Sequence, residues 1–415
     1  MKNYIKALLL ICFIIGVSFS VFAENFYTQE EFSAFVTQEP EIISRAAVLM
    51  DAETGAILYA KNPHDEIPPA SLTKLMTMHL LMNEIEAGRA SYDEIIPITV
   101  ASWAQSQPPR SSLMFLEPRQ IVTLREIMLG LSVSSGNDAA VAAALRLAPT
   151  MQDFAELMNA EARRMGLTVT TFVEASGISW RNVTTAYEFA QFCRQYIKLH
   201  PQTLKDFHSV QVFSYPVAGN LPPSYRNNPR TITQNNNNRL LETFPGVDGL
   251  KTGFIEQSGF NIALTAQREQ YGENTRFIAV LLGAPSYRGG DRVRDADGRR
   301  LLTWAFENFK TVHPVVNRID NAKLWKGKGS SVELMLQESP AFSSPVNRGF
   351  TVNYDVFIPF PLVAPISKGS PAGYLVFYDQ HGEISRSLLV AAKDYQKGNI
   401  FKRIWHSIVL LFKRY

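Results

Sequence analysis

Apolar residues recur in two rhythms that divide the 415-residue chain into segments of different structure. Short apolar runs joined by Gly-containing turns occupy residues 45–63 and 258–284, and each predicts a strand, a turn and a second strand. Between them, apolar residues recur at the three- to four-residue spacing of helices. These helical segments are 71–88, 123–133, 138–149, 151–167 and 184–201, and another helix follows at 298–309. Strands at both ends with helices between them predict an α+β domain, an antiparallel sheet with helices packed on it.

The spacing of apolar residues along the chain changes beyond about residue 312. Short alternating runs lie between turns rich in Gly and Pro, and no helical period appears until the last segment. We therefore expect a first domain over residues 24–311 and a small all-β domain over residues 312–393. Within the first domain, residues 222–238 are rich in Asn, Pro and Ser, which predicts an exposed loop.

Residues 1–23 have the pattern of a secretory signal peptide. Lys2 and Lys6 precede a long apolar run, and Ala23 ends it at a cleavage position that requires a small residue. A retained membrane anchor is the alternative, because the apolar run is long. We expect an exported chain that works outside the cytoplasm.

Cysteine and histidine usage gives no indication of metal or redox chemistry. Cys12 lies in the predicted leader, which leaves Cys193 without a disulfide partner. Cys193 occupies an apolar position of a helical segment, so we expect a buried thiol. The seven histidines show no metal-binding spacing. We expect neither a metal nor a cofactor.

The last segment, residues 394–415, predicts an amphipathic helix. Ile404, Trp405 and Ile408 belong to an apolar stripe, and basic residues lie on the opposite side. The last 23 residues hold six basic residues and one acidic residue, whereas the body of the chain is neutral to acidic, which argues against nucleic-acid binding. The segment is too short to span a bilayer, so we expect it to lie on a membrane surface. A helix docked on the protein's own body is the alternative.

A serine and a lysine three residues apart open the first helical segment. Ser71 and Lys74 follow two prolines, and residues i and i+3 share a helix face, so the amine of Lys74 can reach the hydroxyl of Ser71. The positive end of the helix dipole is expected to lower the pKa of Lys74 toward that of a general base. This pattern predicts a serine nucleophile activated by a lysine. The alternative is a serine N-cap followed by a solvated lysine.

Two further motifs lie downstream. Ser135 and Asn137 stand in the short break between two helices, where a hydroxyl can relay a proton and an amide can hold a substrate amide. The alternative is that these residues only end one helix and begin the next, where Ser, Gly and Asn are common. Lys251, Thr252 and Gly253 stand at the entry to a strand. Lysine can bind a carboxylate, threonine offers a hydroxyl, and glycine lets a substrate backbone lie along the strand.

Taken together and in this order, the motifs are far more specific than any one alone. The constellation resembles the penicillin-recognising serine acyl-transferases. With the leader, the second all-β domain and the amphipathic tail, the chain is most similar to the low-molecular-mass penicillin-binding proteins, D-alanyl-D-alanine carboxypeptidases of the bacterial envelope. The resemblance covers nearly the whole chain after the leader and implies a fold like that of β-lactamases and penicillin-binding transpeptidases.

The resemblance also implies roles for the motif residues. Ser71 would be the acylated nucleophile, Lys74 its base, and Ser135 the group that passes a proton to the leaving amine. Asn137 would orient the substrate peptide. Lys251 and Thr252 would bind the side of the substrate that carries its terminal carboxylate, with Gly253 leaving room for it.

The resemblance also implies an oxyanion hole and a carboxylate-binding arginine. The oxyanion hole would consist of the backbone N–H groups of Ser71 and Phe254. Many members of the family have histidine where this chain has Phe254; the backbone N–H survives that change, but any role of a histidine side chain is lost. An arginine ahead of the last helix of the domain usually supports the carboxylate; Arg294 is the candidate, with Arg292 and Arg299 as rivals.

The implied activity is hydrolysis of the D-Ala–D-Ala bond of peptidoglycan stem peptides at the periplasmic face of the inner membrane, with β-lactams as inhibitors. A β-lactamase is a rival, but it typically needs an added glutamate that activates water, and no clear counterpart stands between the second and third motifs. A murein endopeptidase of the same family is a closer rival, and a non-catalytic envelope scaffold is a third.

Overall fold

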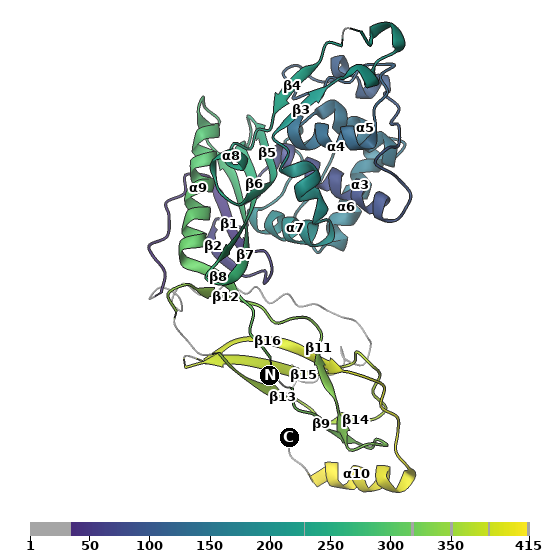
Figure 1. Ribbon diagram of the computed structural model, residues 1–415, viewed down its shortest axis with the longest axis vertical. Helices are drawn as coiled ribbons and strands as arrows, with labels where there is room; N and C mark the ends of the chain where they lie inside the picture. Colours follow the sequence, from purple (N-terminus) through teal and green to yellow (C-terminus); the bar gives the residue numbers. More distant parts are fainter. Residues whose placement is uncertain (1–34, 228, 317–318, 349–351, 381, 413–415) are drawn as a thin grey trace.

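The computed structural model describes residues 35–227, 229–316, 319–348, 352–380 and 382–412 (Figure 1). The predicted signal peptide over residues 1–23 lies outside these residues. The upper part of the molecule in Figure 1 is a sheet covered by helices, and the lower part is built from short strands and a last helix.

The sheet is antiparallel and joins strands from distant parts of the chain. Its order is β2-β1-β7-β6-β5, and Val48 of β1 pairs with Val280 of β7. The strands are β1 (Ala46–Asp51), β2 (Ile57–Lys61), β5 (Val247–Ile255), β6 (Gly259–Gln270) and β7 (Glu273–Ala284). The two predicted strand pairs are confirmed, and β5 adds a further strand at one edge.

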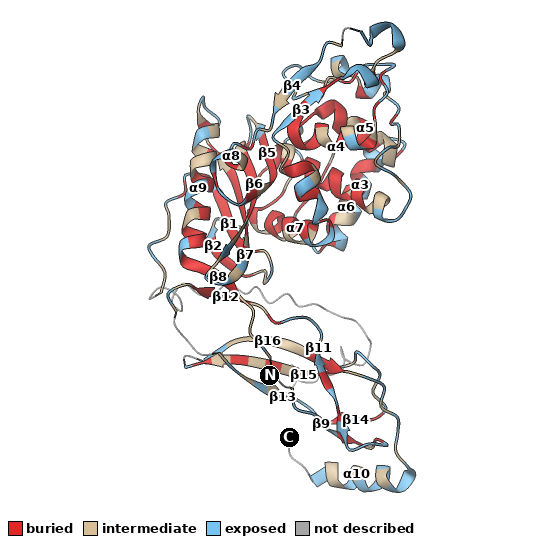
Figure 2. Cartoon of the chain, in the orientation of Figure 1, coloured by how far each residue is buried: buried red, intermediate tan, exposed pale blue. Residues whose placement is uncertain are grey.

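Helices cover both faces of this sheet, which explains why β1 and the second half of β7 are continuous apolar runs. In β1, Val48 and Met50 point into the core beneath α7, whereas Ala47 and Leu49 point into the core beneath α9. One side carries α3 (Lys74–Glu86), α4 (Leu124–Leu129), α5 (Asn137–Leu147), α6 (Met151–Arg164) and α7 (Ala186–Leu199), and the other carries α8 (Leu240–Thr243) and α9 (Gly290–Asn308). Figure 2 shows the buried strands between these layers. The predicted α+β fold is therefore confirmed.

The first helix differs from expectation at its start. Ser71 lies in a 3-10 turn, Ala70–Thr73, and the α-helix begins only at Lys74. Ala70 has a left-handed φ of 51°, and the backbone of the loop around Gly177 presses against it. From Lys74 onward the helix is buried on nearly all sides and forms the central rod of the helical layer.

A long hairpin extends above the helices. Its strands β3 (Val212–Tyr215) and β4 (Ile232–Asn235) pair with each other, and Gln234 binds the Leu113 carbonyl at 3.1 Å. The polar stretch 222–238 is therefore not a simple exposed loop, because its second half returns as a strand toward the helices.

The lower part is all-β, as predicted. Its sheets have the orders β11-β16-β15-β13 and β10-β9-β14, and they enclose a separate apolar core that includes Leu324, Leu375 and Phe377. The strands are β9 (Ala322–Trp325), β10 (Ser331–Val332), β11 (Leu334–Leu336), β13 (Asn353–Phe357), β14 (Leu362–Val363), β15 (Pro371–Asp379) and β16 (Gly382–Ala391). Between the two parts, β8 (Phe309–Val312) pairs with β12 (Phe342–Pro345).

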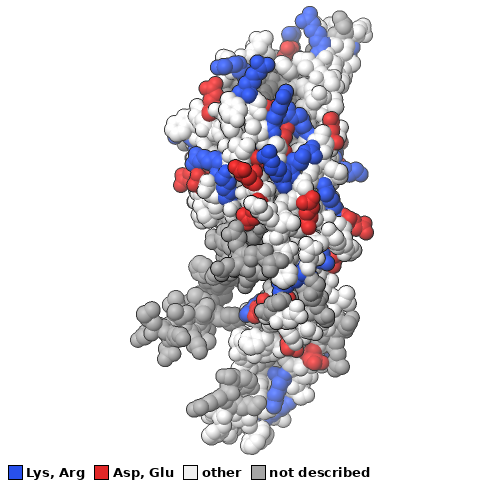
Figure 3. Space-filling model, turned by 90° about the vertical axis from the view of Figure 1, so that its left-hand side faces the viewer, with Lys and Arg blue, Asp and Glu red and all other residues white. Residues whose placement is uncertain are grey.

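The last helix, α10 (Ile400–Phe412), attaches by its polar side. His406 Nδ1 accepts a hydrogen bond from Lys326 N at 2.8 Å, and Lys402 Nζ donates to Gly329 O at 2.8 Å. Phe401, Leu411 and Phe412 remain more than 80 % exposed. Within the described ranges, no helix has the length and apolar character needed to cross a membrane. On the face seen in Figure 3, acidic and basic side chains are interspersed over the upper domain.

Candidate active site

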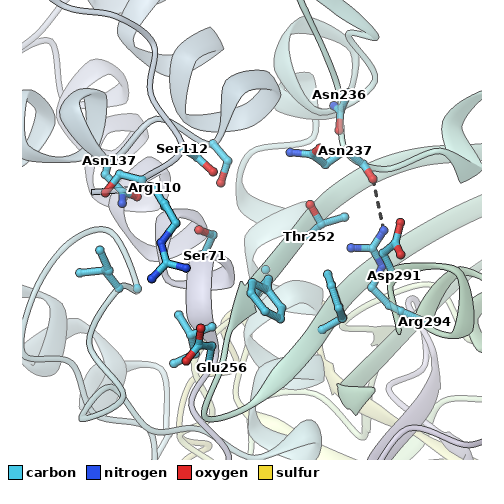
Figure 4. A pocket seen from close by; sticks show the side chains of 18 of the residues that line it. Ser71, Arg110, Ser112, Asn137, Asn236, Asn237, Thr252, Glu256, Asp291 and Arg294 are labelled. Carbon is cyan, nitrogen blue, oxygen red and sulfur yellow. Dashed lines mark hydrogen bonds between the residues drawn. The ribbon is translucent and has the colours of Figure 1, made fainter. Parts of the chain in front are cut away.

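The three sequence motifs meet at one pocket of about 930 Å³ between the helical layer and the edge strand β5. Figure 4 shows Ser71 near the middle of this pocket, with Asn137 on one side and Thr252 and Arg294 on the other. Motif residues that line it are Ser71, Ser135, Asn137, Thr252, Gly253, Phe254 and Arg294.

Lys74 is bound directly to the serine hydroxyl. Its Nζ donates to Ser71 Oγ at 3.0 Å, to Asn137 Oδ1 at 2.8 Å and to Ser176 O at 2.6 Å. Burial lowers the pKa of Lys74 from 10.5 to about 7, although the Glu174 and Asp138 carboxylates favour the charged form. The direction agrees with the sequence argument, but the main cause is burial rather than the helix dipole. A neutral amine is therefore available near neutral pH, in contact with the hydroxyl.

A second lysine is bound to a second serine. Lys251 Nζ donates to Ser135 Oγ at 2.9 Å and to the Thr252 carbonyl at 2.9 Å. Burial, with the nearby positive charges of Lys74 and Arg294, holds the pKa of Lys251 well below its usual range. The pair connects the inter-helix loop to β5, so a proton can move between the two walls of the pocket.

The inter-helix loop has one residue in a left-handed conformation, and an aspartate just after it, which belongs to none of the sequence motifs, binds a neighbouring segment. Ser135 has φ 56°, in the left-handed region. Buried Asp138 accepts hydrogen bonds from the N–H groups of Met114, Phe115 and Leu116 at 2.8–3.0 Å. These contacts tie the start of α5 to residues 114–116, and the side chains on either side of Gly136 line the pocket.

Asn137 binds Lys74 and also lines the pocket. Its Oδ1 accepts from Lys74, while its backbone N–H donates to Ser112 O at 2.8 Å. The acceptor oxygen is thus used by the lysine, and the amide NH₂ of the same group is the end available to a substrate carbonyl.

A loop after α6, which no sequence motif marks, closes the floor of the site. Glu174 Oε2 accepts from Ser176 N and Oγ, both at 2.6 Å, and Oε1 accepts from Gly177 N at 2.7 Å. This folds the loop so that Ser176 O reaches Lys74. Gly177 has φ +82°, and a Cβ there would lie 1.8 Å from Ala70 O, so the loop lies directly against the turn that bears Ser71.

Glu174 also bears on the question of a water-activating glutamate. It lies between the second and third motifs, where no sequence pattern marks a water-activating glutamate. Its Oε1 additionally accepts from Ser179 N at 3.3 Å and Asn182 Nδ2 at 3.1 Å, so both oxygens are committed to the loop. The carboxylate is arranged to fold a loop rather than to bind a water molecule.

The edge strand β5 approaches Ser71 backbone to backbone. A Cβ on Gly253 would lie 2.9 Å from both Ser71 N and Pro69 O, so only glycine fits without displacement. Phe254 follows, 43 % exposed, and its ring packs against Phe260 with centroids 4.3 Å apart. β5 ends the strand order, so its outer edge can pair with an extended peptide.

Of the candidate arginines, Arg294 is the one that lines the pocket. It is buried and donates to Asn237 O at 3.3 Å (Figure 4), and it also binds Asp295 at 2.6 Å. Arg299 instead binds Thr243 at the far side of α9, and Arg292 is exposed. Pocket residues outside the sequence motifs include Arg110, Ser112, Asn236, Asn237, Glu256 and Asp291.

Comparison with known families divides the chain in two. Residues 33–286 match the D-alanyl-D-alanine carboxypeptidase family, and residues 309–397 match the C-terminal domain of penicillin-binding protein 5. D-alanyl-D-alanine carboxypeptidase DacD of Escherichia coli K12 is 33 % identical over 404 residues, which cover 94 % of this chain and 97 % of the relative.

Solved structures agree with these matches. Penicillin-binding protein 5 of Haemophilus influenzae superposes with a TM-score of 0.76 at 28 % identity, covering 87 % of this chain and all of that one. Penicillin-binding protein D2 of Listeria monocytogenes, in its ampicillin-bound form, superposes with a TM-score of 0.54 at 26 % identity over 65 % of this chain and all of that one. The family match spans more than half of the sequence, and the chain belongs to the D-alanyl-D-alanine carboxypeptidase family of penicillin-binding serine peptidases.

Proposed function

We propose that this carboxypeptidase removes the terminal D-alanine from peptidoglycan pentapeptides through an acyl-enzyme on Ser71. The observation that supports this most strongly is the 3.0 Å contact between Lys74 Nζ and Ser71 Oγ, combined with a pKa of about 7 for that amine. A buried neutral amine in contact with a hydroxyl is the arrangement that activates a serine nucleophile.

In the acylation step, Lys74 takes the proton of Ser71 while Oγ attacks the carbonyl carbon of the penultimate D-alanine. The developing oxyanion is stabilised by the backbone N–H groups of Ser71 and Phe254. Gly253 supports this assignment, because a Cβ there would lie 2.9 Å from Ser71 N, so β5 and the turn that bears Ser71 approach closely at this point of the pocket.

The leaving D-alanine needs a proton and a partner for its carboxylate. The proton that Lys74 took from Ser71 passes through Ser135 to the amine nitrogen, which leaves Lys74 neutral again. Lys251, bound to Ser135 at 2.9 Å, holds that hydroxyl in place. Thr252 and Arg294 bind the carboxylate, since both line the pocket on the side of Ser71 away from Asn137 (Figure 4). Water then hydrolyses the ester, with Lys74 again acting as the base.

Carboxypeptidase activity is favoured over β-lactamase activity by Glu174. Its oxygens are occupied by the Ser176, Gly177, Ser179 and Asn182 donors, so it does not prepare a deacylating water. We therefore expect a penicilloyl ester on Ser71 to persist, whereas a β-lactamase would hydrolyse it rapidly.

The direct test is a pair of assays on the purified protein. We expect release of D-alanine from a pentapeptide that ends in D-Ala–D-Ala, and a covalent complex with labelled penicillin that survives gel filtration. Rapid loss of the label would favour the β-lactamase alternative. Absence of both labelling and D-alanine release would favour the non-catalytic scaffold.

The C-terminal helix supports attachment to a membrane surface. Its polar side binds the all-β domain through Lys402 and His406, which turns Phe401, Leu411 and Phe412 outward. Aromatic and aliphatic residues exposed on a basic helix suit the interface of an anionic bilayer. Together with the predicted leader, this supports a location on the periplasmic face of the inner membrane.

Membrane attachment can be measured with vesicles. The purified protein is expected to sediment with vesicles that contain anionic lipid, and the double variant Phe401→Glu, Leu411→Glu is expected to bind at least about tenfold more weakly, because it loses apolar burial. Tyr287→Glu is the matched control, since Tyr287 is 62 % exposed but lies on the upper domain. Equal binding of the double variant and the wild type would contradict the proposal.

A further inference from the structure

Two acceptors besides the serine fix the direction of the Lys74 amine. Asn137 Oδ1 lies at 2.8 Å from Nζ, Ser176 O at 2.6 Å, and Ser71 Oγ at 3.0 Å. A neutral amine has two N–H groups and one lone pair. The two shorter contacts take the N–H groups, so the lone pair faces Ser71 Oγ, whose proton it accepts. The Ser176 carbonyl is therefore part of what makes Lys74 a base toward Ser71.

The Glu174 carboxylate determines where that carbonyl points. Glu174 Oε1 accepts from Gly177 N at 2.7 Å. The N–H of Gly177 and the C=O of Ser176 belong to one trans peptide unit, in which the two groups point in opposite directions. Because the N–H is held by the glutamate, the C=O is turned toward Lys74, where it accepts at 2.6 Å. The carboxylate accepts from Ser176 N and Oγ as well, both at 2.6 Å, which fixes the residue on both sides.

The same carboxylate brings a negative charge close to the base. Burial lowers the pKa of Lys74 to about 7, and the charge of Glu174, ahead of that of Asp138, opposes this fall. On the β5 side the amine faces Lys251, whose own pKa is lowered by burial and by the charge of Lys74. Glu174 thus has a geometric and an electrostatic connection to the same amine.

We propose that Glu174 is a positioning residue for acylation, which turns the Ser176 carbonyl toward Lys74 and keeps a negative charge beside the amine. This inference rests on the proposed function of Lys74 as the base. Glu174 does not line the pocket, so it acts on the amine rather than on the substrate. Loss of its charge favours the neutral amine, and loss of its hydrogen bonds releases the carbonyl that directs the lone pair.

Contacts that do not involve the carboxylate hold the same loop on α3. Thr77 Oγ1 donates to Ala175 O at 2.9 Å, and Asn182 Nδ2 donates to Thr73 Oγ1 at 3.1 Å. Both bonds remain when Glu174 is replaced by glutamine, which has nearly the same shape. We therefore expect Glu174→Gln to fold, with its defect confined to the neighbourhood of the base.

The test is the pH dependence of kcat/KM for D-alanine release from a pentapeptide, and of the rate of acylation by benzylpenicillin. In the wild type both should rise through about pH 7, where Lys74 loses its proton. Glu174→Gln removes an opposite charge, so the midpoint of the rise should move to lower pH by at least about half a unit. On the plateau above the midpoint, kcat/KM should fall about tenfold, since the lone pair is no longer held toward Ser71.

Glu188→Gln is the matched control. The Glu188 carboxylate also folds a loop, because it accepts from the N–H groups of Thr168, Val169 and Thr170 at 2.7–2.9 Å. We expect a loss of thermal stability comparable to that of Glu174→Gln. The pH midpoint should stay at its wild-type value and the plateau within about threefold of it, since this loop is not the one that contacts the base.

Ser176→Ala separates the charge from the hydrogen bonds. It removes one donor to Glu174, the Ser176 hydroxyl at 2.6 Å, and keeps both the charge and the bond from Gly177 N. We expect an unchanged pH midpoint and a plateau that falls less than in Glu174→Gln.

The outcomes also separate this role from the reaction itself. If the wild type shows its midpoint near pH 7 and Glu174→Gln shows the same midpoint, the positioning role is wrong and the proposed function stands. An equal shift in Glu188→Gln would overturn the role as well, because the shift would then follow from a loosened fold. A wild-type protein that neither releases D-alanine nor reacts with penicillin would overturn the proposed function, and the role of Glu174 with it.

Discussion

Replacing Ser71 by alanine is expected to lower D-alanine release from a pentapeptide by at least about 10⁴-fold. Ser71 Oγ is the hydroxyl in contact with Lys74, at 3.0 Å, and the hydroxyl of Ser135 is bound to Lys251 instead. Without Oγ no acyl-enzyme forms, and only binding and the oxyanion hole remain to assist direct attack by water. The measurement is D-alanine quantified over time by a coupled oxidase assay.

Ser112→Ala is the matched control for that experiment. It removes another hydroxyl from the pocket wall, while the Ser112 carbonyl that binds Asn137 N is kept. We expect its kcat/KM to stay within about threefold of the wild type, in the range of surface substitutions away from the chemistry. A Ser71→Ala enzyme with a few per cent of wild-type activity would show that the acyl group is carried elsewhere.

Replacing Lys74 by methionine is expected to lower kcat/KM by about 10³-fold, the usual contribution of a positioned general base. Methionine keeps a long apolar stem in the buried position but removes the amine that contacts Ser71, Asn137 and Ser176. Circular dichroism and thermal unfolding would verify that the variant is folded. Acylation by penicillin, followed in single-turnover mode, isolates the step concerned.

Lys74→Arg distinguishes a base from a mere positive charge. Because the pKa of Lys74 falls from 10.5 to about 7, its neutral form predominates above pH 7, and kcat/KM of the wild type should rise with pH through about 7. Arginine stays protonated throughout this range, so the variant should be nearly inactive and should lack that rise. A Lys74→Arg enzyme with a wild-type pH profile would contradict the role of Lys74 as the base.

Much of the fold could be predicted from the sequence because its signals are local. The hairpin of β1 and β2, and the pairing of this unit with β7, follow from apolar runs that need cover on both faces. The start of the first helix could not be predicted. Ser71 lies in a 3-10 turn rather than in α3. The loop at Gly177, a hundred residues away, lies against Ala70, and the sequence does not show that the two are adjacent.

The same contrast between local motifs and contacts across the fold separates the site residues that could be predicted from those that could not. Ser71, Ser135 and Lys251 were found because each stands in a recognisable local motif. Asp138 and Glu174 were not, because they act on backbone N–H groups of loops that the sequence does not show to be adjacent.

The polar stretch that includes Asn236 and Asn237 is mostly exposed, as its composition indicates, but its place in the pocket wall could not be predicted. Its composition is that of an exposed loop, and only the return of β4 to the helices brings these residues into the pocket wall.

The most direct measurement of the central claim is mass spectrometry of the protein after incubation with benzylpenicillin. β-Lactam opening adds the whole antibiotic to the nucleophile, so the intact protein should gain the mass of one penicillin molecule. After proteolysis, the added mass should lie on the peptide that contains Ser71, and Ser71→Ala should gain none. An adduct on another residue, or an unmodified wild-type protein, would contradict a serine acyl-enzyme at this position.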